Sequence, residues 1–100
     1  DVIVIDEAQF FVGLYYFVRD AIDAWRRSVY VIGLSGDYQR QPFGEILNVI
    51  ALADKVTTLS AICLCGAAAH FTRRKNPNSG QVIIGGSEAY EAQCHACFVG

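Results

Sequence analysis

Two apolar segments with a helical pattern between them, all within the first 34 residues, constrain the fold of this chain most. Residues 2–5 form a continuous β-branched run, and residues 29–34 form a second apolar run. Such runs are typical of strands buried on both faces of a parallel sheet. The order strand, helix, strand predicts a βαβ unit, which favours a right-handed parallel crossover. Between the runs, the apolar positions that recur at helical spacing are Leu14, Phe17, Val18, Ala21 and Trp25.

The segment after the second apolar run is expected to form a short helix. It spans residues 45–53 and follows a break at residues 42–44, which read Pro-Phe-Gly. After residue 55 the sequence changes from helical patterns to short strand-like segments around cysteines, which places a domain boundary near residue 55. We therefore expect residues 1–55 to form an α/β part and residues 56–100 to form a small part held together by its cysteines. On one side, the short helix would carry Ile46, Leu47, Ile50 and Ala53.

Residues 56–100 are predicted to form short strands around two cysteine pairs. The expected elements are strands at 56–62 and 69–74, a polar turn over 73–80, a strand at 82–86 that ends in a glycine pair, and a helical turn over 87–93.

The composition excludes several classes of protein. Eight Lys and Arg stand against ten Asp and Glu, and 53% of the residues are hydrophobic, which argues against disorder. No stretch approaches eighteen uninterrupted apolar residues, so a membrane span is not expected. The mildly acidic net charge argues against a broad basic surface that binds nucleic acid electrostatically. The chain starts at Asp1 directly before a strand, so we expect it to be a piece of a longer protein.

Two close pairs of cysteines, Cys63 with Cys65 and Cys94 with Cys97, suit a metal site. Nothing resembles a signal peptide, and without export such pairs are more often metal ligands than disulfides. The second pair has CxxC spacing, whereas the first is CxC and is not expected to form the usual zinc knuckle with its turn amides. The alternatives are disulfides, four free thiols, a degraded site, or a ligand supplied by one of the two histidines, His70 and His95.

Two acids, Asp6 and Glu7, follow the first apolar run directly. In P-loop nucleotide-binding proteins this is the Walker B position, where the first acid holds Mg²⁺ directly or through water. The adjacent glutamate can take a proton from a nucleophile. The alternative is a solvated acidic end of a strand.

Four motifs in order resemble the type II (cellular-type) thymidine kinases. They are IDEAQFF at residues 5–11, LSGDYQRQPFG at 34–44, IGGSEAY at 84–90, and the paired cysteines. The resemblance covers essentially all 100 residues. It implies an α/β fold in which a P-loop (RecA-like) parallel sheet part is followed by a small zinc-ribbon-like lasso domain. It also implies an enzyme that transfers the γ-phosphoryl group of ATP to the 5′-hydroxyl of thymidine, in DNA precursor salvage.

The resemblance also assigns roles to individual residues. Glu7 matches the catalytic base, and Asp6 matches the acid that assists Mg²⁺. Arg74 matches a basic position able to meet phosphates, although residues 73–75 can equally be a solvated charged face. The nucleoside pocket would be lined by Phe10, Leu34, Tyr38 and Phe43, for which the alternative is core packing. The lasso over the base would be formed by Val82, Ile83, Ile84, Gly85 and Gly86, with Tyr90 near the deoxyribose, the alternative being a surface hairpin.

Cofactors and partners follow from the same resemblance. It implies ATP with Mg²⁺, thymidine as substrate, thymidine triphosphate as feedback inhibitor, a homotetramer and a cytoplasmic location. It also implies a structural Zn²⁺ held by Cys63, Cys65, Cys94 and Cys97. Neither nucleic acid nor a membrane is expected as a partner. The GxxxxGK[ST] phosphate loop does not occur in these residues, so we expect it upstream and expect the isolated 100 residues to be inactive.

Two other functions compete with the kinase. Residues 6–9, DEAQ, resemble motif II of DExx helicases, and residues 36–39, GDYQ, faintly resemble a later helicase motif. A helicase-type ATPase would leave residues 84–90 and both cysteine pairs unexplained. A non-catalytic zinc-ribbon interaction module is the third candidate, and it is favoured only if the complete protein lacks a phosphate loop.

Overall fold

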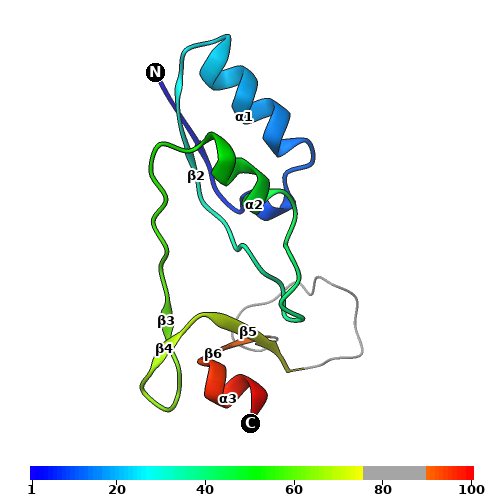
Figure 1. Ribbon diagram of the computed structural model, residues 1–100, viewed down its shortest axis with the longest axis vertical. Coiled ribbons are helices and arrows are strands. Elements are labelled where there is room, and N and C mark those ends of the chain that lie inside the picture. The colour runs from blue at the N-terminus through cyan, green and yellow to red at the C-terminus, as the bar shows by residue number, and fades with distance from the viewer. Residues whose placement is uncertain (76–89) are drawn as a thin grey trace. The chain divides into compact units, whose positions relative to one another are not determined.

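The computed structural model describes residues 1–75 and 90–100, and the chain divides into two compact units (Figure 1). Unit 1 contains residues 1–35 and 42–56, and unit 2 contains residues 36–41 and 57–100. The strand predicted at residues 82–86 lies outside the described residues.

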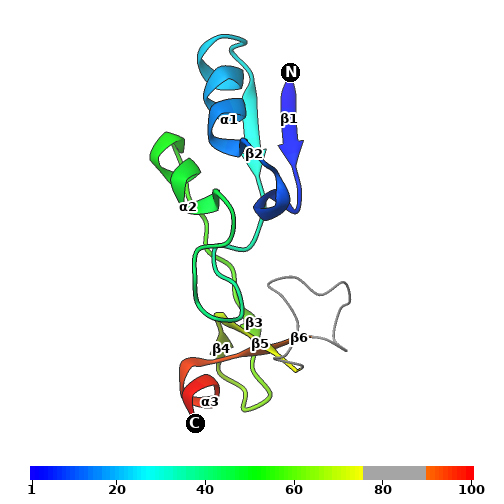
Figure 2. The ribbon, with the colours of Figure 1, turned by 90° about the vertical axis from the view of Figure 1, so that its right-hand side faces the viewer.

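Unit 1 is a two-stranded parallel sheet with its helices on one side. Strands β1 (Val2–Ile5) and β2 (Ser28–Val31) pair in parallel, with Val2 opposite Ser28. The predicted strand–helix–strand order with parallel pairing is therefore confirmed. Figure 2 shows α1 and α2 on the same side of the two strands. The helical elements are η1 (Ala8–Phe10), α1 (Leu14–Asp23), α2 (Ile46–Val49) and η2 (Ile50–Leu52), of which η1 and η2 are 3₁₀ turns.

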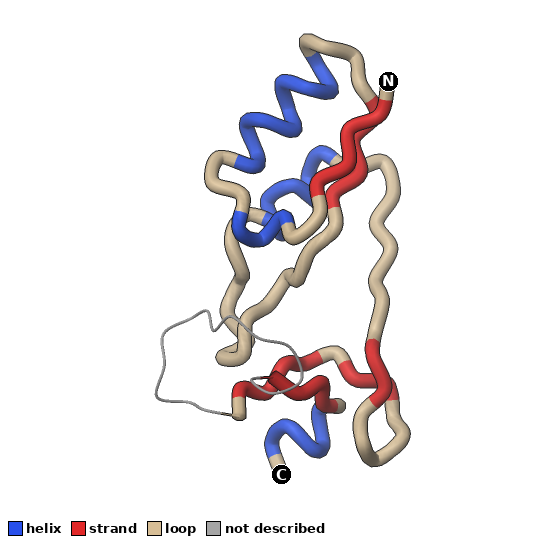
Figure 3. The backbone as a smooth tube through the Cα atoms, turned by 180° about the vertical axis from the view of Figure 1, so that it is seen from behind, coloured by secondary structure: helices blue, strands red, loops and turns tan. Residues whose placement is uncertain are grey.

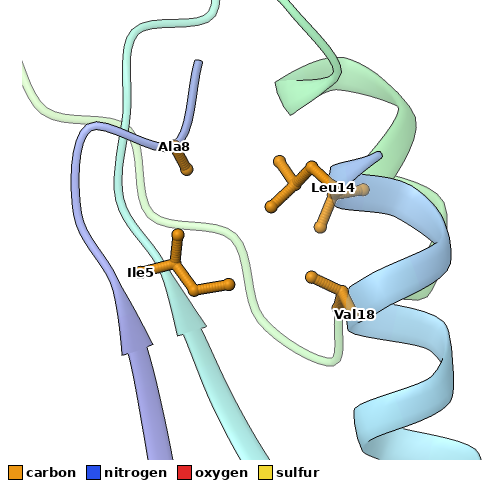
Figure 4. Close-up of a cluster of buried hydrophobic side chains, with 5 residues drawn as sticks. Ile5, Ala8, Leu14 and Val18 are labelled. Atoms are coloured by element: carbon orange, nitrogen blue, oxygen red, sulfur yellow. The ribbon is translucent and has the colours of Figure 1, made fainter. Parts of the chain in front are cut away.

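The core of unit 1 forms where α1 faces the end of β1. Leu14 and Val18, one turn apart on α1, are almost completely buried and point toward Ile5 and Ala8 (Figure 4). Full burial of a side chain such as leucine stabilises a fold by about 1.5–3 kcal/mol. Val49 of α2 completes this cluster. The helical spacing read from the sequence therefore identifies the buried face of α1.

The opposite face of the β1–β2 pair is exposed, so the prediction of strands buried on both faces is wrong for this chain. Val2, Val4, Tyr30 and Ile32 are all more than half exposed. Successive side chains of a strand point to opposite faces, and the described helices of unit 1 pack against only one of them. The alternate residues of both strands are consequently left outside the core.

The end of helix α1 differs from the predicted pattern. Helix α1 ends before Trp25 because Arg26 adopts a left-handed φ of 55°, and the Arg27 N–H donates to the Ala21 carbonyl at 2.9 Å. Trp25 is half exposed and packs edge-on against Phe17 instead.

The predicted apolar side of the second helix is also partly wrong. Leu47 and Ile50 are exposed, and the buried side consists of Ile46, Val49 and Leu52. These three residues share a face because the helix continues as a 3₁₀ turn, in which every third residue aligns.

Glu45 caps helix α1 from a distant part of the chain. Its carboxylate accepts backbone N–H groups of Gly13, Leu14 and Tyr15 at 2.8, 3.2 and 3.1 Å. These donors belong to the first turn of α1, where backbone N–H groups have no partner within the helix. The hydrogen bond from the Tyr15 N–H is the main cause that lowers the pKa of Glu45 below its ordinary value of 4.5. Glu45 thus ties the segment before α2 to the start of α1.

Replacing Glu45 with glutamine is expected to lower the melting temperature at pH 7 by several degrees. Folding lowers the pKa of Glu45, so its stabilising effect is present above pH 4.5 and is lost as the pH falls through the lowered value. The gap in melting temperature between the two proteins should therefore close on acidification. Asp54→Asn, the same charge change at an exposed acid, is the control. A constant gap down to the acid unfolding transition would contradict this role.

Gly44 is expected to tolerate no side chain. Its φ of 60° is left-handed, and an added Cβ would meet the carbonyl oxygen of Gln9 and lie 3.0 Å from its carbonyl carbon. Gly13 is a matched control, because its φ of 77° is equally strained for alanine but its Cβ would meet nothing within 4 Å. Gly13→Ala should cost about 1–2 kcal/mol. Gly44→Ala should cost clearly more in denaturant unfolding, and equal losses would contradict the contact.

The described residues of unit 2 form two short antiparallel strand pairs and a helix (Figure 3). The predicted strands at 56–62 and 69–74 are only partly formed. The helical turn predicted over 87–93 is wrong for residues 90–93, because their backbone pairs with a strand distant in sequence, Gln93 lying opposite Phe71. The elements are β3 (Ala61–Ile62) with β4 (Ala68–Ala69), β5 (Phe71–Arg74) with β6 (Tyr90–Gln93), and α3 (His95–Val99).

Residues 36–41 belong to unit 2. The predicted single boundary near residue 55 would have placed this segment in unit 1. The Arg40 guanidinium lies 4.9 Å from the ring centroid of Phe98 on α3, and that of Arg74 lies 3.9 Å from the ring of Tyr38. Contacts of an arginine with an aromatic face at these distances are attractive. Buried Asp37 shapes the segment by accepting the backbone N–H groups of Gln39 and Gln41.

Candidate functional site

The two predicted acids lie at the carboxyl end of β1, where the chain turns out of the strand. Both are exposed, and Asp6 Oδ1 accepts the Glu7 backbone N–H at 2.8 Å. Glu7 has a left-handed φ of 51°, which is uncommon for a residue other than glycine. Strained backbone of this kind concentrates at functional sites. The geometry thus presents two neighbouring carboxylates at the strand end, where ligands of open α/β sheets bind.

Gln9 connects the ends of the two strands, and it had no predicted role. Its amide Nε2 donates to Glu7 Oε2 at 2.9 Å, and its Oε1 accepts the Leu34 N–H at 3.1 Å. Strand β2 ends at Val31, short of the predicted residue 34, because β1 has already turned away. The Gln9 side chain therefore supplies the acceptor that a longer partner strand would have provided. The sequence signal for a role of Gln9 was its place within the motif IDEAQFF at residues 5–11.

Three predicted pocket residues lie in unit 1. Phe10 is 51% exposed and meets the buried ring of Phe43 edge-on, with 5.4 Å between the ring centroids. Leu34 is half exposed, and its backbone N–H donates the hydrogen bond to Gln9 Oε1 described above. Phe10 and Phe43 thus form an aromatic pair within unit 1, the unit that also contains the two carboxylates. The assignment of these residues to a nucleoside pocket stays a prediction.

Three further predicted residues, Tyr38, Arg74 and Tyr90, are brought together in unit 2. Arg74 is only 4% exposed. Its guanidinium lies 3.9 Å from the Tyr38 ring centroid and 5.6 Å from that of Tyr90, and its Nη2 donates to the Tyr90 hydroxyl at 3.3 Å. Arg74 thus holds two tyrosines from segments far apart in the sequence. The predicted phosphate role of Arg74 is not tested by this geometry. The remaining predicted residues, Val82 to Gly86, lie outside the described residues.

The four cysteines gather into one cluster in unit 2. Their Sγ atoms all lie within 4.8 Å of one another, and those of Cys65 and Cys94 are 3.6 Å apart. Sulfurs bound tetrahedrally at about 2.3 Å from Zn²⁺ are separated by about 3.8 Å, so the donor set and its spacing fit this ion. All four are free thiols, and the described cluster includes neither His70 nor His95. The turn between β3 and β4 and the start of α3 thus bring the two pairs together.

Backbone amides surround the sulfur of Cys63. The N–H groups of Cys65 and Cys94 donate to it and lower the pKa of the Cys63 thiol from 9.0 to about 6. The CxC pair was expected to lack such bonds, but one comes from its own turn and the other from the second pair. Hydrogen bonding of its thiol to Cys63, and then to the other two sulfurs, raises the pKa of Cys97 to about 12. The cluster therefore favours one thiolate already before any metal binds.

Comparison with known proteins decides the family. The sequence profile of the family described as thymidine kinase matches residues 1–98 of this chain. The chain belongs to the thymidine kinase family. Relatives of this chain include thymidine kinase a of Arabidopsis thaliana, which is 46% identical over 99% of the chain. They also include the thymidine kinase of Oryza sativa subsp. japonica, 50% identical over 94%, and the cytosolic thymidine kinase of Homo sapiens, 39% identical over 97%.

The predicted resemblance to cellular-type thymidine kinases is thereby confirmed. The chain spans 42%, 35% and 42% of the length of these three relatives, so it corresponds to less than half of each. Within residues 1–75 and 90–100, none of its helices combines the length and apolar character that crossing a membrane requires.

Proposed function

We propose that the complete protein transfers the γ-phosphoryl group of ATP to the 5′-hydroxyl of thymidine and so supplies thymidine monophosphate for DNA synthesis. Family membership and the names of the relatives support this activity. The observation that carries it to particular residues is the Asp6–Glu7 pair at the carboxyl end of a parallel strand. Phosphoryl transfer depends on positioning and charge neutralisation, and a carboxylate beside the attacking hydroxyl can accept its proton.

In this proposal Glu7 is the general base and Asp6 assists Mg²⁺. The exposed Glu7 carboxylate is accessible to a substrate hydroxyl, and one of its oxygens is held by Gln9. When bound, Mg²⁺ neutralises charge on the phosphates, and ATP is the phosphoryl donor. Residues 1–55 would form the C-terminal part of a P-loop (RecA-like) kinase domain. The parallel pairing of β1 with β2 supports this assignment.

The acceptor site would use aromatic and apolar side chains around the nucleoside. Phe10, Leu34, Tyr38 and Phe43 are assigned to its walls, and Tyr90 to the deoxyribose. Flat apolar surfaces of this type suit a base and a sugar. The backbone of Val82, Ile83, Ile84, Gly85 and Gly86 would read the pyrimidine edge, which glycine permits because it allows close approach.

The cysteine cluster would hold a structural Zn²⁺ in a zinc-ribbon-like lasso domain over residues 56–100. All four ligand positions would be occupied by cysteine sulfur, so this ion would stabilise the domain and take no part in the chemistry. The proximity of the four sulfurs supports the proposal.

Assembly, regulation and location complete the proposal. We assign a homotetramer, feedback inhibition by thymidine triphosphate at the acceptor site, and a cytoplasmic location. The name of the human relative, cytosolic thymidine kinase, supports the last of these.

The test is a steady-state assay of the complete protein for thymidine monophosphate formation from thymidine and ATP. Thermal shift with thymidine, thymidine triphosphate and single-stranded DNA separates the alternatives. Stabilisation by thymidine and thymidine triphosphate alone supports the kinase, and stabilisation by DNA alone supports the helicase-type ATPase. Stabilisation by none of them, without product formation, would leave the zinc-ribbon interaction module.

A further inference from the structure

Gln9 is a buried polar side chain at the carboxyl ends of both strands. It is 5% exposed and joins two segments of the chain, donating to Glu7 Oε2 and accepting from the Leu34 backbone N–H. A hydrogen bond to a charged group contributes more than one between neutral groups. The bond to Glu7 therefore restrains a carboxylate that is otherwise exposed.

Close packing fixes the position of Gln9 itself. A Cβ added at Gly33 would lie 2.7 Å from Gln9 Oε1, and one added at Gly44 would collide with the Gln9 backbone. The absence of a side chain at Gly33 leaves room for the Gln9 amide, and its absence at Gly44 leaves room for the Gln9 backbone. A side chain confined in this way orients its amide group without losing further conformational freedom when a substrate binds.

We propose that Gln9 is a positioning residue for the general base. It holds Oε2 of Glu7 through its amide N–H and leaves Oε1 as the oxygen that accepts the proton of the attacking hydroxyl. This inference rests on the proposed kinase function. It also explains why the Gln9 amide N–H faces the Glu7 carboxylate. A purely structural role, in which Gln9 only accepts the Leu34 N–H, would not require that orientation.

Two substitutions of Gln9 in the complete protein separate positioning from structure. Gln9→Met keeps a similar volume and removes both hydrogen bonds. Gln9→Glu keeps an acceptor for the Leu34 N–H but presents a carboxylate to Glu7 in place of a donor. If Gln9 acts through Glu7, kcat should fall roughly 10- to 100-fold in Gln9→Met and at least as far in Gln9→Glu. The KM for thymidine should stay within about threefold of wild type in both, since a lost positioning contact acts on the reacting geometry.

Unit 2 offers a matched control. Gln93, which is also buried, donates Nε2 to Glu91 Oε2 at 2.9 Å, the same pairing two residues apart. Gln93→Met should leave kcat within about twofold of wild type, and melting temperatures of all variants are measured alongside.

Each outcome decides the inference. It is overturned if Gln9→Met keeps wild-type kcat, if Gln9→Glu resembles wild type, or if kcat and KM change together with the melting temperature. It is also overturned if both variants are unfolded at the assay temperature, because the role is then structural. If the wild-type protein forms no thymidine monophosphate, this result contradicts the proposed function instead, before any variant is compared.

Discussion

Replacing Glu7 with glutamine is expected to lower kcat for thymidine phosphorylation by about 10²–10⁴-fold, the usual contribution of a general base. The amide keeps the size and shape of the side chain but cannot accept the proton of the 5′-hydroxyl. Glu7 is exposed and makes its hydrogen bond to Gln9 through one oxygen, so the fold should tolerate the change. Binding of thymidine, measured by calorimetry in the absence of ATP, should be nearly unaffected.

Glu91→Gln is the control for this substitution. Glu91 accepts a hydrogen bond from Gln93 as Glu7 does from Gln9, but it lies on β6 of unit 2. This variant should retain the wild-type kcat. Near-normal turnover in Glu7→Gln would remove the carboxylate from the mechanism, whereas loss of thymidine binding would make Glu7 a binding residue.

Replacing Cys94 with serine is expected to abolish stoichiometric zinc binding and to destabilise unit 2 severely. Cys94 is buried, its sulfur lies 3.6 Å from that of Cys65, and its N–H donates to the sulfur of Cys63. Serine supplies no thiolate, and three ligands leave a structural site incomplete. Because metal binding and folding are coupled in such sites, limited proteolysis should cut residues 57–100 of the variant first.

Elemental analysis of metal-replete protein measures the zinc content directly. Wild type should contain about one Zn²⁺ per chain and release it on acidification, because protons compete with the metal for thiolates. His70→Ala, at an exposed histidine outside the described cluster, should keep its zinc. Zinc content near zero in wild type would contradict a structural metal and leave four free thiols.

Local patterns in the sequence predicted the parts of the fold that depend on them. The β-branched run gave β1 with its bounds, and the spacing of Leu14, Val18 and Ala21 gave the buried side of α1. The close spacing within each cysteine pair likewise pointed to one cluster, which the structure contains. In each case the signal lies within a few residues of the feature that it predicts.

The remaining features depend on partners distant in the sequence. Glu45 caps a helix about 30 residues away, and Gln9 replaces a strand partner for Leu34, so neither role follows from neighbouring residues. The end of α1 was missed because Arg26 adopts the left-handed conformation that glycine normally signals. Residues 90–93 were assigned a helical turn because the strand they pair with lies beyond a long intervening segment.

The segment 36–41 makes the two units discontinuous in sequence. The chain enters unit 2 at Gly36, returns to unit 1 at Pro42 and leaves it again after Val56. Cutting or recombining the gene at residue 56 would therefore separate Tyr38 and Arg40 from Arg74, Phe71 and Phe98, which their contacts join. Exchange of the second half between relatives should succeed only when this six-residue segment is transferred with it.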